Sequence, residues 1–463
     1  MTSGGLLEPE VAERVLARAL AAGGEFAEIF AERRGGQTMS IDESRIESVQ
    51  AGDEEGAGVR VISGGTAYFA HVDGLDPADL ERAATEAASA LRGERREHRP
   101  LTAAATTPQP VERRPEDVPA ERKAALLREL DERGRATGAE IAQLTASYAE
   151  ARREITVANS EGLLTADDRT RVRIGVQTVA RRGDTVETGA ETLGGHRGFE
   201  LFDGDPGTIA EQAAGKALTL LDASPAPSGS MPVVVAGGFG GVLFHEMTGH
   251  GLEADHIQKD ASVYTGKLGE QVAQPLLNAY DDGRMPNEWG SDSIDDEGAP
   301  TQKTLVIEEG RLTSFLYDRL CAGRDDVAST GNGRRESFRH LPIPRMTNTY
   351  IAPGDAEPEA MIAEVKRGFY AASFAGGQVE PATGDFVFGV SEGYLIEDGR
   401  LTRPCRGATL VGNCLDALAA IDALGSDFEM KTGICGKGGQ RVPVGTGQGH
   451  VRIAAMTVGG TEA

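Results

Sequence analysis

The sequence predicts an α+β protein, in which helices and strands alternate in the first half and β-hairpins dominate the second. Three observations carry this prediction. Apolar residues recur at helical spacing within 8–22, with charged residues between them. Short apolar runs bounded by glycine follow the predicted helices. Two stretches, 305–313 and 394–402, share the form apolar run, acidic pair, Gly-Arg-Leu-Thr, which is typical of a strand, a tight turn and a returning strand.

Residues 1–100 are expected to form an N-terminal α+β domain. Its predicted elements, in chain order, are a helix over 8–22, strands over 27–32, 37–50 and 58–69, and a helix over 77–91.

Residues 101–229 are expected to hold a linker and a middle α/β region. The linker is 101–119, which is rich in Thr, Pro and Ala. The elements predicted after it are a helix over 120–137, strands over 141–149, 154–158 and 170–180, and a helix over 208–221.

Residues 230–463 are expected to form a C-terminal domain rich in antiparallel hairpins. A buried strand over 232–236 and a glycine turn precede a helix over 240–255. The hairpins at 305–313 and 394–402 are predicted to have glycine at a positive-φ position and to lie in one sheet.

The segment from His245 to His250 reads His-Glu-Met-Thr-Gly-His. Neutral imidazoles bind zinc, and a neighbouring carboxylate can deprotonate a metal-bound water. We therefore take His245 and His250 as candidate metal ligands and Glu246 as the candidate general base of a hydrolase.

The two histidines stand five residues apart, and a regular helix would point them in different directions. For both to bind one metal, the helix must break, tighten or carry a π-type bulge near Gly249. The alternative is an ordinary helical pair of Glu246 and His250, with His245 merely packed or solvated.

A third ligand must come from elsewhere, and the residues alone leave two candidates. His256 follows His250 by six residues, the metzincin interval, but Glu253 stands where that pattern has glycine. Cys435 lies in the glycine-rich stretch 433–439, where the backbone can approach an ion closely.

Weaker polar landmarks lie between these motifs. The basic, glycine-rich stretch 331–336 is expected to bind a peptide carboxylate, to shape a cleft or to form a solvated turn. Arg345 and Asn348 are candidates for pairing with substrate backbone groups. No residue is assigned to substrate binding.

Charge and composition narrow the classes of function. The net charge of −25 argues against direct nucleic-acid binding, because phosphates would be repelled. The 4 cysteines are too scattered for a disulfide scaffold. No targeting or membrane segment is recognised, so we expect a cytoplasmic protein.

The chain resembles the TldD/PmbA family of zinc metalloproteases, on its metal-bearing TldD side. The resemblance is carried by the motif segments 244–253, 345–350, 433–437, 442–445 and 457–461. It implies that residues 230–463 form a metallopeptidase domain, that His245, His250 and Cys435 hold Zn²⁺, and that Glu246 is the catalytic base.

The resemblance also favours Cys435 over His256 and implies a partner. Family members work with a related metal-free, PmbA-like subunit, so we expect a heterodimer, with a homodimer as the other possibility. The expected reaction is hydrolysis of peptide bonds in unfolded or small peptides. Two alternatives are cleavage of an amide in a specialised metabolite and a non-catalytic binding subunit.

Overall fold

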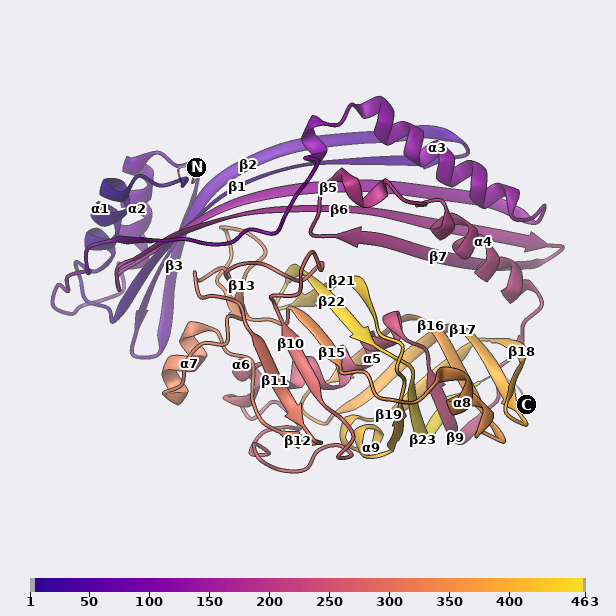
Figure 1. Ribbon diagram of the computed structural model, residues 1–463. Helices are drawn as coiled ribbons and strands as arrows, with labels where there is room; N and C mark the ends of the chain where they lie inside the picture. The colour runs from indigo at the N-terminus through magenta and orange to yellow at the C-terminus, as the bar shows by residue number, and fades with distance from the viewer. Residues whose placement is uncertain (1–4, 461–463) are drawn as a thin grey trace.

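The computed structural model describes residues 5–460 and has two bodies: an arched sheet and a second body beneath the concave side of the arch (Figure 1). Thr461, the last residue of the carboxyl-terminal motif, lies outside the described residues. The two ends of the described chain lie toward opposite ends of the elongated molecule. The element content confirms the α+β prediction.

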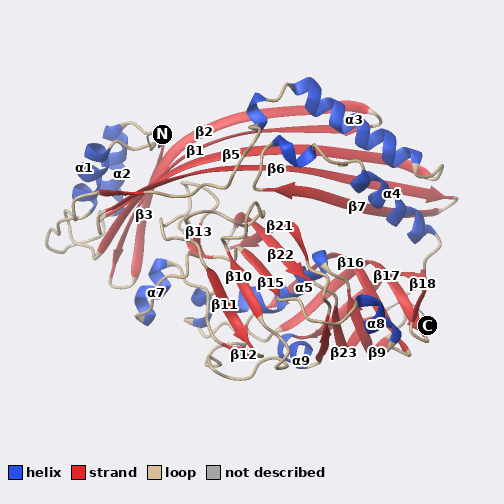
Figure 2. Ribbon diagram, viewed as in Figure 1, coloured by secondary structure: helices blue, strands red, loops and turns tan. Residues whose placement is uncertain are grey.

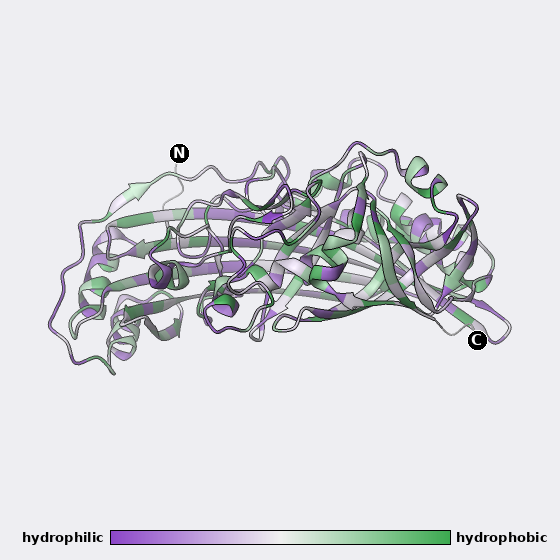
Figure 3. Ribbon diagram, turned by 90° about the horizontal axis from the view of Figure 1, so that it is seen from below, coloured by the Kyte–Doolittle hydropathy of each residue, from purple (hydrophilic) through white to green (hydrophobic). Residues whose placement is uncertain are grey.

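The arched sheet has seven strands in the order β3-β2-β1-β5-β6-β4, with β7 paired to β6. Seen from below, its long strands carry alternating hydrophilic and hydrophobic bands (Figure 3). The strands are β1 (Phe26–Asp42), β2 (Arg45–Ser63), β3 (Thr66–Asp73), β4 (Thr102–Ala104), β5 (Ile141–Asn159), β6 (Leu163–Arg182) and β7 (Thr185–Gly195).

Several predicted strand boundaries in this sheet are wrong. The predicted strand 37–50 crosses a hairpin turn at Glu43 and Ser44, which both have positive φ. The predicted strand 58–69 likewise crosses the turn at Gly64 and Gly65. The separate strands 141–149 and 154–158 are one strand, β5. Charged and glycine-rich stretches resemble loops in sequence. In this sheet they are parts of the long strands, where the sheet faces the second body.

The helices of the first half lie in two pairs (Figure 2). Helices α1 (Pro9–Ala19) and α2 (Pro77–Ala87) pack at one end of the arch, and α3 (Ala120–Ala136) and α4 (Thr208–Leu221) cover its outer face. The structure confirms all four predicted helices, and α4 matches its predicted bounds. Their buried apolar residues face the sheet, as the helical spacing predicted.

The second body contains an eight-stranded and a six-stranded sheet. The strands of the larger sheet are β8 (Ser224–Pro225), β9 (Gly229–Val235), β16 (Arg367–Glu380), β17 (Asp385–Glu397), β18 (Arg400–Arg406), β19 (Ala408–Asn413), β20 (Ile421–Leu424) and β23 (Val451–Gly459).

The six-stranded sheet has the order β12-β11-β10-β15-β22-β21, and a short pair, β13 and β14, lies near it. One hydrophobic core joins this sheet to the larger one. The strands are β10 (Ala279–Asp282), β11 (Lys303–Glu308), β12 (Arg311–Leu312), β13 (Gly333–Arg334), β14 (Ile343–Pro344), β15 (Asn348–Ile351), β21 (Glu429–Lys437) and β22 (Gln440–Gln448).

The two matching hairpins form as predicted, but in different sheets. Gly310 and Gly399 have φ of 76° and 75°, and the residue before each also has positive φ. Positive φ at both central residues is the signature of a two-residue hairpin turn. The β11–β12 hairpin belongs to the six-stranded sheet and β17–β18 to the eight-stranded sheet, so the prediction of one shared sheet is wrong. Local turn chemistry fixes a hairpin without fixing its distant neighbours.

A buried ionic network joins the arch to the second body. Glu28 of β1 accepts hydrogen bonds from Arg60 of β2 at 2.7 Å and from Arg335 at 2.5 Å. Arg169 of β6 donates to Asp296 at 2.6 Å. All five side chains are almost fully buried, so each charge depends on its partners. The predicted divisions at residues 100 and 229 stay predictions, and strands on both sides of residue 100 share the arched sheet.

Among the helices of residues 5–460, none is long and apolar enough to cross a membrane.

Candidate metal centre

The histidine motif lies on a helix that changes its winding at the motif. Strand β9 leads through a glycine turn into a short α-helix, α5 (Gly241–Phe244), and a π-helical turn follows over His245–Gly249. The backbone N–H of His250 donates to the carbonyl of His245, which is the i→i+5 bond of a π-helix. The structure thus has one of the distortions that the five-residue spacing required, and this turn brings both histidines to one side.

Glycine is required within this turn because neighbouring side chains lie close to it. A Cβ at Gly249 would overlap Sδ of Met346, and one at Gly251 would lie 2.7 Å from the ring of Tyr264. Met346 is fully buried and belongs to the motif 345–350. The two glycines therefore let the helix pack directly against the core.

The π-turn places His245 and His250 beside Cys435 of strand β21. One candidate ligand atom from each residue lies within 4.8 Å of the other two. The Cys435 Sγ and His250 Nε2 atoms are 3.1 Å apart. Of the residues that could hold a metal together, this is the one group found within 5–460, and all three members are buried.

The chemistry of this cluster fits a zinc ion. Two imidazoles and a thiolate belong to the ligand set that zinc prefers. His245 Nδ1 is buried and has no hydrogen-bond partner, which is costly in a protein interior unless another group satisfies it. Three protein ligands would leave a fourth position for water or substrate, as catalytic zinc sites do.

Burial and neighbouring charges shift the pKa values of the cluster residues. Burial alone would raise the pKa of the Cys435 thiol, but the two histidines beside it hold that pKa at about 5. Burial alone would lower the pKa of His250, but Glu253 and Cys435 raise it well above its ordinary value. These shifts favour a thiolate at Cys435 and a protonated His250, so a metal that binds here would displace a proton.

Glu253 contacts the nitrogen of His250 that faces away from Cys435. Its Oε2 lies 2.9 Å from His250 Nδ1 and 3.1 Å from Lys437 Nζ, and the carboxylate is fully buried. Burial alone would raise the pKa of Glu253, but Lys437 and His250 hold it at about 2. Sequence reasoning treated Glu253 only as a replaced glycine. Its position three residues after His250, on the same helical face, was the signal that could have found it.

A hollow of about 410 Å³ opens on one side of the cluster and is lined by Glu246, His250 and His256. Strand β16 borders it through Gly377, Gln378 and Val379. Glu246 Oε2 lies 3.9 Å from His250 Nε2, and about a quarter of its side chain is exposed. His256 borders the hollow but stands outside the three-residue cluster.

The weaker landmarks are structural rather than exposed. Arg334 and Arg335 are buried, so the prediction of a solvated turn at 331–336 is wrong. Arg345 donates to the carbonyl of Cys435 at 2.7 Å, and Asn348 donates to the carbonyl of Asp282 at 2.7 Å. Neither Arg345 nor Asn348 lines the hollow, and their pairing with substrate stays a prediction.

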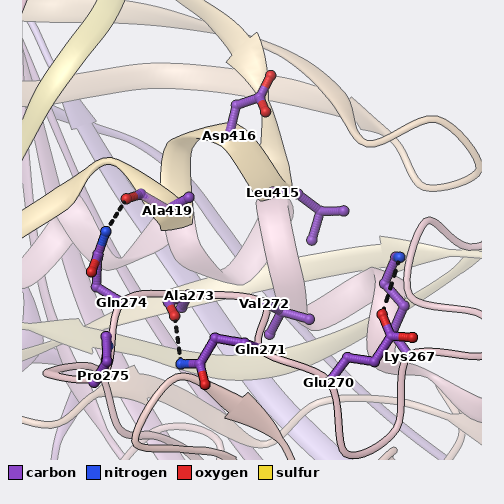
Figure 4. A pocket seen from close by; sticks show the side chains of 10 residues that line it. All are labelled: Lys267, Glu270, Gln271, Val272, Ala273, Gln274, Pro275, Leu415, Asp416 and Ala419. Carbon is purple, nitrogen blue, oxygen red and sulfur yellow. Dashed lines mark hydrogen bonds and ion pairs between the residues drawn. The ribbon is translucent and has the colours of Figure 1, made fainter.

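Another hollow, of about 390 Å³, lies between 267–275 and helix α9 (Cys414–Ala419) (Figure 4). Gln271 and Gln274 donate to the carbonyls of Ala273 and Ala419. Lys267 pairs with Glu270, and no motif residue lines this hollow, so it is not the candidate site.

Family models match most of the chain. They are described as PmbA/TldA metallopeptidase domain 1 over residues 27–91, the central domain over 113–221 and the C-terminal domain over 228–460.

Two relatives are similar in sequence. A Haemophilus influenzae protein named metalloprotease TldD homolog is 38% identical, over 94% of this chain and 93% of its own length. A Saccharolobus solfataricus protein named zinc metalloprotease TldD homolog is 32% identical, over 62% of this chain and 64% of its own length.

Two solved structures share the fold. A Thermotoga maritima protein has a TM-score of 0.78 and 22% identity, over 94% of this chain and 96% of its own. TldE from Thermococcus kodakarensis has a TM-score of 0.75 and 20% identity, over 94% of this chain and 97% of its own.

Proposed function

Because the chain belongs to the TldD/PmbA family of metallopeptidases, we propose that it is a zinc-dependent peptidase with Glu246 as its general base. The observation that carries the proposal is the convergence of His245, His250 and Cys435 next to an open hollow. The Saccharolobus solfataricus relative, which is named a zinc metalloprotease, supports zinc as the metal.

His245, His250 and Cys435 would hold the ion, and Glu253 and Lys437 would fix the orientation of His250. Zinc, when bound, supplies a polarised water and polarises the scissile carbonyl. Glu246 borders the hollow, where its carboxylate would accept a proton from the attacking water and return it to the leaving amine.

The hollow favours a peptide in an extended conformation. Strand β16 presents Gly377, Gln378 and Val379 along its wall, and an extended substrate can lie along such a strand. We propose unfolded or small peptides as substrates, and the cytoplasm as the compartment, since the cysteines are scattered along the sequence.

We further propose that the active assembly contains a related, metal-free subunit. The likeness in fold to TldE supports this choice. Light scattering and peptide cleavage, measured on the chain alone and after mixing with such a subunit, test it. Full activity of a strict monomer would contradict it.

Glu246→Gln tests the catalytic proposal. The change keeps the side-chain size and removes its basicity, so zinc should remain while turnover falls by roughly 10² to 10⁴-fold. Glu121→Gln on the exposed side of α3 is the matched control and should leave turnover unchanged. If Glu246→Gln keeps most of the activity, Glu246 is not the base.

A further inference from the structure

A groove of about 850 Å³ separates the concave face of the arched sheet from the β21–β22 hairpin. In Figure 1 this hairpin lies directly beneath the arch. The groove is distinct from the hollow at the metal centre, because the two share no lining residue. Its lining holds seven arginines and four acidic residues, in a chain whose net charge is −25.

A row of small residues crosses the floor of the groove. Gly52, Gly36 and Ala151 are directly paired neighbours across β2, β1 and β5. A Cβ placed on Gly52 would meet no atom within 4 Å, so the space above it is open. Such a trench lets a ligand backbone lie close to the sheet.

Two guanidinium groups in the groove are not used by the fold. Within residues 5–460, the side chains of Arg173 and Arg441 make no hydrogen bond or ion pair, and both line the groove. Arg173 is half-buried, which makes an unpaired charge costly. By contrast, Arg171 donates to Asp292 at 2.7 Å.

The opposite wall includes the β21–β22 hairpin, which presents an apolar pair beside Arg441. Ile434 is 51% exposed and lies in the groove beside Pro443, its cross-strand partner. Because side chains alternate along a strand, Ile434 faces the groove while Cys435 faces the metal centre. The groove and the metal centre thus lie on the two faces of one hairpin.

We propose that this groove binds an acidic, extended segment of the substrate polypeptide, remote from the bond that is cleaved. Carboxylates would pair with Arg173 and Arg441, which present planar donors suited to them. The segment's backbone would lie over Gly52, and its apolar side chains would contact Ile434. Two unpaired guanidinium groups match a few carboxylates, whereas a nucleic acid brings a continuous row of phosphates that would need many more free cations.

The proposal takes the ligand to be part of a peptidase substrate, so it rests on the proposed function. The test therefore measures binding separately from cleavage. The zinc-loaded full chain carrying Glu246→Gln is titrated with two fluorescein-labelled decapeptides. One alternates glutamate with valine, and the other has glutamine in place of every glutamate. The glutamate peptide should bind at least about tenfold more tightly, and added salt should remove most of the difference.

Two variants locate the site. Arg173→Gln with Arg441→Gln removes the free charges, and Gly52→Leu fills the trench while leaving every charge in place. Each should weaken binding of the glutamate peptide about tenfold. Arg128→Gln on the exposed side of α3 is the matched control and should not change it.

Equal affinity for the two peptides overturns the proposal, as does binding that neither the arginine pair nor Gly52→Leu weakens. An oligonucleotide that displaces the glutamate peptide at lower concentration than the unlabelled peptide itself also overturns it. Loss of cleavage by the unmodified chain, with peptide binding intact, would instead overturn only the peptidase function.

Discussion

Glu253 and His250 are joined by a contact of 2.9 Å between Oε2 and Nδ1. This contact leaves Nε2 of His250 pointing to Cys435, 3.1 Å away. A carboxylate that holds the far nitrogen of a ligating histidine fixes both its orientation and its tautomer. Lys437, on the same strand as Cys435, contacts the same Oε2 atom of Glu253 at 3.1 Å. The buried carboxylate of Glu253 therefore links the histidine motif to the strand that carries Cys435.

Glu253→Gln should weaken zinc binding about 10 to 100-fold, because the amide holds His250 less strongly than the carboxylate. Competition with a chromogenic chelator measures the affinity. Glu270→Gln, at an exposed site, is the control. Unchanged zinc affinity in Glu253→Gln would show that the carboxylate does not position the ligand.

Gly249→Ala should destabilise the protein by about 1–3 kcal/mol, because its Cβ would overlap Met346 in a packed core. Gly215→Ala is the matched control, since Gly215 lies in α4 with open space around it. That control should gain roughly 0.5–1 kcal/mol from better helix propensity. Denaturant unfolding compares the two. A neutral Gly249→Ala would contradict the packing described at the π-turn.

Arg335→Met should lower the free energy of unfolding by about 3–5 kcal/mol, because it leaves Glu28 and Asp296 buried with one partner fewer. Arg113, which pairs with Asp203 at the surface, gives the comparison. Arg113→Gln should cost at most about 1 kcal/mol. Similar costs for both variants would mean that the buried network does not hold the arch to the second body.

His196 should make stability depend on pH. Burial lowers its pKa to about 3, and it is held neutral between the carbonyl of Ser291 and the N–H of Thr170. Below its ordinary pKa of about 6.5, the unfolded chain binds a proton that the folded chain does not. The free energy of unfolding should therefore fall as pH falls from about 6.5 to 3.

His196→Gln should flatten this part of the pH profile, whatever its effect at neutral pH. Urea unfolding at a series of pH values, for both proteins, gives the difference profile. Parallel profiles for the two proteins would show that His196 is not the group responsible.

The helices of the first half were predicted well because their apolar residues recur at helical spacing. A helix places residues with this spacing on one face, where they can be buried together. Helix α4 matches its predicted bounds. The long strands were predicted less well. Gly35 and Gly36 read as a break, but β1 continues through them because paired strands on both sides supply its hydrogen bonds. The pairing of β1 with β5 joins residues more than 100 positions apart and leaves no local pattern.

For the site, the spacing of His245 and His250 predicted that the helix must be distorted, and the π-turn is that distortion. The meeting with Cys435 could not be derived from local sequence, because 185 positions separate that residue from His250. The resemblance to the family indicated that Cys435 joins the two histidines. The contact of Glu253 with His250 was missed although their spacing of three residues indicated it, whereas its contact with Lys437 on a distant strand left no local signal.

The zinc content of the purified chain and of two variants tests the central claim most directly. Elemental mass spectrometry should find about one zinc per chain in the unmodified protein and in His256→Ala, because His256 stands outside the ligand cluster. Cys435→Ala should have lost the zinc, since two imidazoles alone hold it weakly. Zinc that stays in Cys435→Ala and is lost from His256→Ala would contradict the account and transfer the third ligand to His256.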